Sequence, residues 1–167
     1  MHISTDLLKE LREQSGAGIM ECRNTLLEAE GNMDKALEIL KEKALFKVEK
    51  KKDRAVSQGL IEAYIHAGGR IGAMVEVNCE TDFAARTDEL KELAHNLALQ
   101  IAAMSPQFLS SEEAPEEADI NPQTDCLLLQ PYIRDPDVTI QDIINETIAK
   151  VGENIQVGRF TRFELGE

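Results

Sequence analysis

Aromatic residues are scarce in this 167-residue chain, which has no tryptophan and an aromatic fraction of 4%. Long apolar runs are also missing, since no stretch approaches the roughly 20 residues that a membrane-spanning helix needs. Residues 1–6 show no basic segment leading into an apolar one, so we expect no secretory signal. The hydrophobic fraction of 43% is ordinary for a globular protein. We therefore expect a cytoplasmic protein that makes no contact with membranes.

Cysteine is too sparse for a disulfide framework or a structural zinc site. The three cysteines, at positions 22, 79 and 126, are odd in number, widely spaced and without a Cys-x-x-Cys pair. The histidines, at positions 2, 66 and 95, are not close to them in the sequence. We expect each cysteine to be a small packing residue, and we expect neither a metal nor a cofactor.

Basic residues are outnumbered, with 18 Lys and Arg against 31 Asp and Glu, a formal net charge of −13. Direct nucleic-acid binding needs clustered positive charge, so this composition argues against it. The one basic run, Lys47 to Arg54, is interrupted by Val48, Glu49 and Asp53, and is typical of a solvated helix end or linker. Most of the excess acid lies in residues 105–137.

The motifs of the common catalytic sites are absent as well. The chain has no Gly-x-Ser-x-Gly elbow, no His-Glu-x-x-His pair and no phosphate-binding Gly-x-x-x-x-Gly-Lys loop. Gly16-Ala17-Gly18 precedes an expected helix, but no strand comes before it, so it does not fit a dinucleotide site. We therefore expect that the protein is not an enzyme.

Residues 4–52 predict three short helices of about 10 residues. Ser4 or Thr5 is a suitable N-cap for the first, and Gly16 ends it. The second follows Gly18 with apolar residues at 19, 22, 26 and 29, and the third follows the cap Asn32. A bundle of this size buries little core, so residues 1–54 form a marginal helical module and linker.

After residue 55 the apolar pattern changes from helical to alternating. Residues 60–66 and 71–78 read as two strands joined by Ala67-Gly68-Gly69-Arg70, which is a hairpin signal. Thr87 should then cap a long helix with an apolar stripe at Leu90, Leu93, Ala94, Leu97, Ile101 and Met104.

The remainder predicts an acidic linker, a helix and a last strand. Residues 105–125 are rich in Ser, Glu and Pro and should be flexible. Thr139 and Asp142 resemble a capping box for the next helix, and residues 155–165 alternate as a strand. The fold class is therefore α+β, with the helical bundle followed, in residues 55–167, by a small antiparallel sheet packed with helices.

The loop of residues 78–86 is unusual, because it places one of only five phenylalanines between acidic and polar residues. In one interpretation, Phe83 folds back onto the following helix, which Asp82 caps. In the other, Asp82 and Phe83 project together as a wedge into a partner. The sequence pattern alone leaves both open.

Three segments resemble the elongation factor Ts family, in the family's order. The first is Leu11-Arg12 with Ser15-Gly16-Ala17-Gly18-Ile19-Met20 and Cys22. The second runs from Tyr64 through Gly68-Gly69-Arg70-Ile71-Gly72 to Asn78-Cys79-Glu80-Thr81-Asp82-Phe83. The third is Gly152-Glu153-Asn154-Ile155 with Arg162-Phe163-Glu164.

This resemblance implies a guanine-nucleotide exchange factor for the GTPase elongation factor Tu, with a ubiquitin-associated-like N-terminal module and a core, or dimerisation, domain. It implies that the loop Thr81, Asp82, Phe83 and Ala84 helps to dislodge Mg²⁺ from the nucleotide site of the GTPase. It further implies that the N-terminal module contacts the GTPase through Arg12, Ile19 and Met20. The hairpin tip would add contacts from His66, Gly69 and Arg70.

The chain departs from the family pattern in three places. Ser15 replaces the usual threonine, and Ala84 replaces the usual valine beside the wedge. The acidic linker stands where full-length relatives have a longer helical insertion, and some relatives have two core halves. We therefore expect a homodimer that restores the second half, with Tyr64, Met74 and Phe160 as candidate interface residues.

Two other functional classes account for less of the sequence. A ubiquitin-binding adaptor would account for the first 50 residues but leaves the hairpin and its loop unexplained. A small acidic hydrolase would need a titratable constellation that the sequence does not display.

Overall fold

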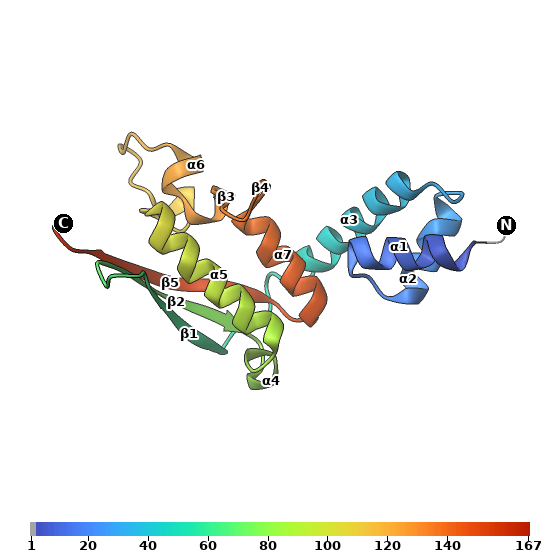
Figure 1. The fold of residues 1–167 in the computed structure, drawn as a ribbon, viewed down its shortest axis with the longest axis horizontal. Coiled ribbons are helices and arrows are strands. Elements are labelled where there is room, and N and C mark those ends of the chain that lie inside the picture. Colours follow the sequence, from blue (N-terminus) through green and yellow to red (C-terminus); the bar gives the residue numbers. More distant parts are fainter. Residues whose placement is uncertain (1–2) are drawn as a thin grey trace. The chain divides into compact units, whose positions relative to one another are not determined.

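The computed structural model describes residues 3–167, which form two compact units, the first ending at Lys51 and the second spanning Lys52–Glu167. The division falls within the basic run Lys47 to Arg54. Figure 1 shows helices alone in the first unit, and a sheet with helices in the second. Among the described residues, no helix has the length and apolar character needed to cross a membrane.

The first unit consists of α1 (Thr5–Ser15), α2 (Ile19–Glu28) and α3 (Met33–Glu49). As predicted, the side chain of Ser4 caps α1, Gly16 ends it with φ 65°, and Asn32 caps α3. The three helices share a small core made of Leu11, Cys22, Leu26, Ala29, Ala36 and Leu40.

One expectation for these helices was wrong. The third helix has 17 residues, not about 10, because residues 41–49 are mostly strong helix formers with no glycine or proline to stop them. Ile19 lies in the first turn of α2 and is 54% exposed.

The second unit is built on a three-stranded antiparallel sheet in the order β1-β2-β5, with β1 (Gln58–Ile65), β2 (Ile71–Cys79) and β5 (Ile155–Glu164). The predicted hairpin is confirmed, with Ile65 opposite Gly72 next to the turn. Gly68 and Gly69 have backbone φ angles of 92° and 68°, which residues with a Cβ rarely adopt. A bulge between Glu76 and Val77 shifts the register with β5.

Helices cover one face of this sheet. The long helix α5 (Asp88–Met104) packs on β1 and β2, and α7 (Ile140–Val151) packs beside α5 (Figure 1). The predicted stripe of α5 is buried except for Met104, and the capping box of Thr139 and Asp142 is present. The predicted α+β class is confirmed.

The opposite face of the sheet is exposed and largely apolar. Its four most exposed large side chains are Ile61 at 62%, Ile65 at 66%, Met74 at 46% and Phe163 at 73%. Of the residues expected at an interface, Met74 alone lies on this outer face. Tyr64 and Phe160 pair with the buried residues Ala73 and Val75, so they face the helices instead.

The expected linker, residues 105–125, contains two short helices, and further short elements follow it up to residue 139. Residues 105–139 hold the short helices η1 (Ser111–Glu113), α6 (Pro122–Asp125) and η2 (Leu127–Leu129), and a two-stranded sheet of β3 (Pro131–Tyr132) and β4 (Asp135–Thr139). Phe108 forms an isolated parallel bridge with Cys126. The segment is therefore a folded loop closed at its base, and its flexibility stays a prediction.

A buried pair of glutamines joins this loop to α5. The side-chain amide of Gln100 donates to Oε1 of Gln130 at 3.1 Å and to the carbonyl of Pro131 at 3.1 Å. Its own oxygen accepts from the backbone N–H of Ile133 at 3.0 Å. Gln130 donates to the carbonyl of Thr124 at 2.6 Å. The two buried amides thus fix the backbone of residues 124–133.

We predict that the outer part of the loop is dispensable. Replacing residues 111–119 with Gly and Ser at equal length should change the exchange activity that the family resemblance implies by less than about twofold, because the closure entropy of a flexible loop depends mainly on its length, which is unchanged. The hydrogen bonds at the base, such as Phe108 N–H to the carbonyl of Asp125, stay in place. A folded variant with a large loss of activity would show that the segment is a contact surface.

Candidate functional site

The loop singled out in the sequence is a short helix, α4 (Asp82–Ala85), at the end of the second unit shown at the bottom of Figure 1. Phe83 is 77% exposed, the highest value among the large hydrophobic residues described. The interpretation in which it folds back onto the next helix is therefore wrong. Asp82 does not cap α5, because Thr87 does so; Asp82 instead pairs with Arg86 at 3.1 Å.

The two neighbours of Phe83 in the expected site differ in their placement. Thr81 caps α4, its hydroxyl accepting from the N–H of Ala84 at 3.3 Å. Ala84 is only 4% exposed, so its methyl group packs inside the unit rather than on the flank of a wedge. Thr81 and Asp82 are exposed beside Phe83, so three of the four expected site residues are accessible.

The carboxylate of Glu153 holds the start of this loop. Its Oε1 accepts from the backbone N–H of Thr81 at 2.9 Å, and its Oε2 lies 2.7 Å from the Thr81 hydroxyl. The thiol of Cys79 donates to the carbonyl of Thr81 at 3.1 Å. The amide, hydroxyl and carbonyl of Thr81 are all occupied, so the backbone that leads into Phe83 is fixed.

The electrostatics of the loop make Cys79 unreactive. Burial raises the pKa of the Cys79 thiol, and the negative charges of Glu153 and Glu80 raise it further. Because only the thiolate is nucleophilic, this cysteine is a packing and hydrogen-bonding residue at neutral pH. The three cysteines are free and buried, as the sequence predicted for small packing residues.

The predicted contact residues of the first unit are all exposed on its surface. Ile19 and Met20 begin α2 and are 54% and 57% exposed, and Arg12 is exposed on α1. The turn from Gly16 to Gly18 joins the two helices at this point. Exposed large apolar side chains and an exposed guanidinium are suited to contact with another protein.

The hairpin tip and the α4 loop lie at opposite ends of the sheet. His66, Gly69 and Arg70 are exposed in the turn, and the Tyr64 hydroxyl lies 3.0 Å from Nδ1 of His66. Eight paired residues, from Ile65 to Gln58, separate the tip from the end where Cys79 leads into α4. At about 3.4 Å per residue the two sites are about 25 Å apart, so the structure does not bring them together.

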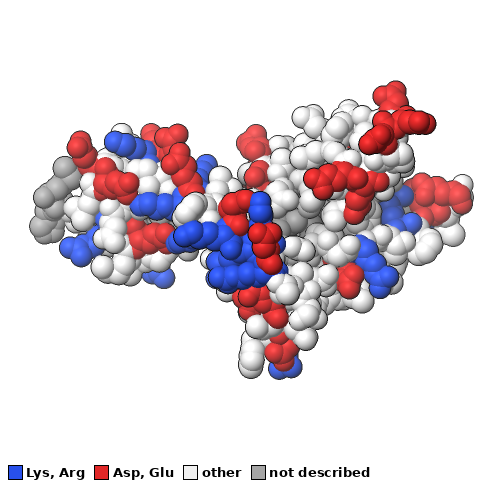
Figure 2. Space-filling view, turned by 180° about the vertical axis from the view of Figure 1, so that it is seen from behind, with Lys and Arg blue, Asp and Glu red and all other residues white. Residues whose placement is uncertain are grey.

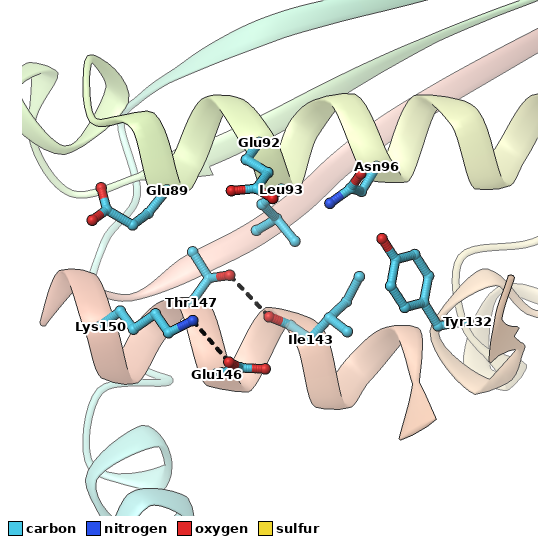
Figure 3. Close-up of a pocket in the computed structure, with 9 residues that line it drawn as sticks. All are labelled: Glu89, Glu92, Leu93, Asn96, Tyr132, Ile143, Glu146, Thr147 and Lys150. Carbon is cyan, nitrogen blue, oxygen red and sulfur yellow. Dashed lines mark hydrogen bonds and ion pairs between the residues drawn. The ribbon is translucent and has the colours of Figure 1, made fainter. Parts of the chain in front are cut away.

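A polar cavity of about 230 Å³ lies elsewhere in this unit, between α5 and α7. Figure 3 shows Glu89 and Asn96 of α5 facing Thr147 and Lys150 of α7, with Tyr132 at one end. Burial is the main cause that raises the pKa of the Tyr132 hydroxyl. None of the site residues predicted from the sequence lines this cavity.

Charge does not single out a catalytic or metal centre. Figure 2 shows basic side chains gathered near the middle of that view, with acidic side chains among them and spread over the rest of this face. Within residues 3–167, no group of three or more His, Cys, Asp or Glu side chains could hold a metal ion.

Sequence reasoning missed the role of Glu153 and Asn154. Both lie in a matched motif, Gly152-Glu153-Asn154-Ile155, yet no contact was assigned to them. The signal was a helix-ending glycine followed by two polar residues just before a strand, where polar side chains reach back to neighbouring backbone.

Comparisons with known proteins agree on one family. A family model described as "Elongation factor TS" matches residues 3–122. The chain is 47% identical to the elongation factor Ts of Thermoanaerobacter sp. (strain X514), over 99% of this chain and 96% of the relative. It is 47% identical to that of Thermotoga neapolitana, over 100% and 99%, and 44% identical to that of Carboxydothermus hydrogenoformans, over 99% and 90%. The alignments span 195 or 196 positions, so these relatives carry residues that this shorter chain lacks.

Proposed function

The chain belongs to the elongation factor Ts family, and from that premise we propose that it is a guanine-nucleotide exchange factor for the GTPase elongation factor Tu. The protein acts in the cytoplasm by binding the GDP-bound GTPase and promoting release of GDP, so that GTP can bind. It carries out no covalent chemistry, needs no cofactor and makes no direct contact with nucleic acid.

The observation that carries this proposal is the presentation of Phe83. An aromatic ring that is 77% exposed sits on a short, capped helix whose backbone is held by Glu153 and Cys79. Exposed aromatics on rigid supports are typical of residues that dominate binding energy, because little entropy is lost when they bind. Phe83 inserts into the GTPase, and the carboxylate of Asp82 beside it helps to dislodge Mg²⁺ from the nucleotide site.

The mechanism is a thermodynamic coupling between two ligands of one GTPase. A factor that binds the nucleotide-free GTPase more tightly than the loaded form must weaken nucleotide binding by the same ratio. GDP is held largely through its phosphates and Mg²⁺, so displacing the metal is an efficient way to release it. A ratio of about 10⁴ requires about 5.5 kcal/mol of differential binding.

The other contacts are assigned by position. We propose that the first unit is a ubiquitin-associated-like module that binds the GTPase through Arg12, Ile19 and Met20. The hairpin tip, with His66, Gly69 and Arg70, contacts a second part of the partner. Their exposure supports both assignments.

Release of a fluorescent GDP analogue from elongation factor Tu tests the function directly. Stopped-flow mixing with excess unlabelled GDP should show release accelerated in proportion to factor concentration until it saturates. Denatured factor and the GTPase alone provide the baselines. Release that stays at the baseline at micromolar factor would reject the proposal.

We further propose that the working form is a homodimer joined through the outer face of the sheet. Ile61, Ile65, Met74 and Phe163 leave an apolar surface there that monomers seldom expose. Glu76 and Arg159 lie on the same face, 3.3 Å apart. A two-fold axis would let Glu76 of each copy pair with Arg159 of the other. A second copy also supplies the core half that larger relatives contain.

Met74→Lys should convert this dimer into a monomer, because it places a charge in the centre of the apolar face. Sedimentation equilibrium at micromolar concentration should then give a mass near 18.6 kDa for the variant and twice that for the parent. Met104→Lys is a matched control, since Met104 is 44% exposed at the end of α5 on the other side of the sheet. A monomeric parent with full exchange activity would contradict the proposal.

A further inference from the structure

Three consecutive residues, Gly152 to Asn154, connect α7 to β5 and touch two segments that are distant in sequence. Gly152 ends α7 with φ 81°, and its N–H donates to the carbonyl of Ile148 at 2.8 Å. This left-handed turn directs the next two residues back toward residues 80–81 and 52–54. We call residues 152–154 the clasp.

The first half of the clasp is the bond network between Glu153 and Thr81. A hydroxyl has one proton, and the shorter distance, 2.7 Å to Oε2, identifies Glu153 as its acceptor. The hydroxyl oxygen then accepts from the N–H of Ala84. Glu153 therefore fixes both the position of Thr81 and the direction of the hydroxyl that caps the helix bearing Phe83.

The second half is Asn154, which is only 2% exposed. Its side-chain amide donates to the carbonyls of Arg54 at 2.8 Å and Lys52 at 3.2 Å. Its backbone N–H donates to Oε1 of Glu80 at 2.7 Å, and that carboxylate also lies 3.5 Å from the guanidinium of Arg54. One buried residue thus fixes both the chain that follows the first unit and the residue before the α4 loop.

We propose that the clasp positions the Phe83 loop for nucleotide exchange, with Glu153 and Asn154 as positioning residues, and that it holds the backbone of residues 52–54 in the same arrangement. This inference rests on the proposed exchange function. The loop has few apolar contacts of its own, since Ala84 is the one buried residue of α4. Polar bonds from the clasp therefore set how often Phe83 is presented in the geometry that enters the partner.

Loss of the clasp should lower the rate of exchange more than binding. The first unit and the hairpin tip keep their own contacts, so the concentration of factor at half-saturation should change by less than about threefold. The saturated rate depends on the fraction of loops in the competent geometry. For Glu153→Ala we expect the saturated rate of GDP release to fall by about tenfold.

Three variants separate positioning from folding. Glu153→Ala removes both acceptors of Thr81, whereas Glu153→Gln keeps one amide oxygen for the Thr81 N–H and should recover most of the rate. Glu146→Gln, on α7, is the matched control, because Glu146 pairs with Lys150 and makes no bond to the loop. Amide hydrogen exchange should quicken at Thr81 and Ala84 in Glu153→Ala alone.

The Asn154 half is tested without the partner. Trypsin attacks the carbonyls of lysine and arginine, and the carbonyls of Lys52 and Arg54 are the two that Asn154 holds. In Asn154→Asp a carboxylate would face both, so cleavage after residues 52 and 54 should speed up by about tenfold relative to cleavage after Lys41 and Lys43.

The outcomes are distinguishable. If the parent protein does not accelerate GDP release from elongation factor Tu, the exchange function is rejected. Amide hydrogen exchange and proteolysis would still test whether the clasp fixes residues 52–54 and 81–84. If the parent is active and Glu153→Ala releases GDP at the same saturated rate, the positioning role of Glu153 is overturned. If Glu153→Ala fails to fold, Glu153→Gln provides the test. A large loss of its exchange rate while the Thr81 amide keeps its normal protection from hydrogen exchange would also overturn the positioning role.

Discussion

Replacing Phe83 with alanine should lower GDP release from elongation factor Tu by about thirtyfold or more while leaving the free energy of unfolding unchanged. The expected loss follows from the roughly 2 kcal/mol that truncating a dominant interface residue costs. Stability should hold because the ring is 77% exposed and contributes little to the core. Stopped-flow release of labelled GDP and urea unfolding of the same preparation measure the two quantities.

Phe46→Ala provides the matched control for that variant. Phe46 is also an exposed aromatic, at 61%, but lies on α3 under the ammonium group of Lys50. It should exchange at the parental rate. Normal exchange by Phe83→Ala would remove Phe83 from the mechanism, and unfolding of that variant would show that the ring has a structural role instead.

Gln100→Ala should destabilise the second unit by about 3 kcal/mol, the largest stability effect we expect from a polar residue in this chain. The substitution leaves a cavity and removes the partner of three groups, the buried amide oxygen of Gln130 and the part-buried N–H of Ile133 and carbonyl of Pro131. Each buried group without a partner costs about 1–3 kcal/mol unless water enters.

Urea unfolding monitored by circular dichroism measures this change. Gln107→Ala is the control, because Gln107 is exposed and its backbone N–H, which the substitution keeps, is bonded to the carbonyl of Asp125. A shift below about 1 kcal/mol for Gln100→Ala would mean that the network is readily replaced by water and does not hold residues 124–133 in place.

The helices could be predicted from local signals because capping residues in the sequence mark where they begin. Ser4, Asn32, Thr87 and Thr139 each cap a helix with a side-chain oxygen, and these bonds span only three residues. The hairpin followed for the same reason, since its turn needs glycine where φ is positive. Phe83 stood out because an aromatic ring in a polar loop has few apolar neighbours in the sequence to pack against.

What escaped prediction depends on residues far apart in the chain. The bond between Glu153 and Thr81 joins positions 72 residues apart, and no local pattern pairs them. The residues of the exposed outer face were predicted only in part, Met74 correctly but not Tyr64 or Phe160, because alternation in a strand does not tell which face a helix will cover. The strands β3 and β4 are too short, at 2 and 5 residues, to show a period.

The hairpin tip and the α4 loop lie at opposite ends of β1 and β2, so the length of these strands sets the distance between the two proposed contact sites. If two points on the GTPase must be reached at once, the paired strands act as a spacer of set reach. Removing two residues from each strand would shorten that reach by about 7 Å and keep every side chain on its face. Removing one would turn the buried face outward. Natural variation in length should therefore collect in the loop of residues 105–125 and leave the hairpin alone.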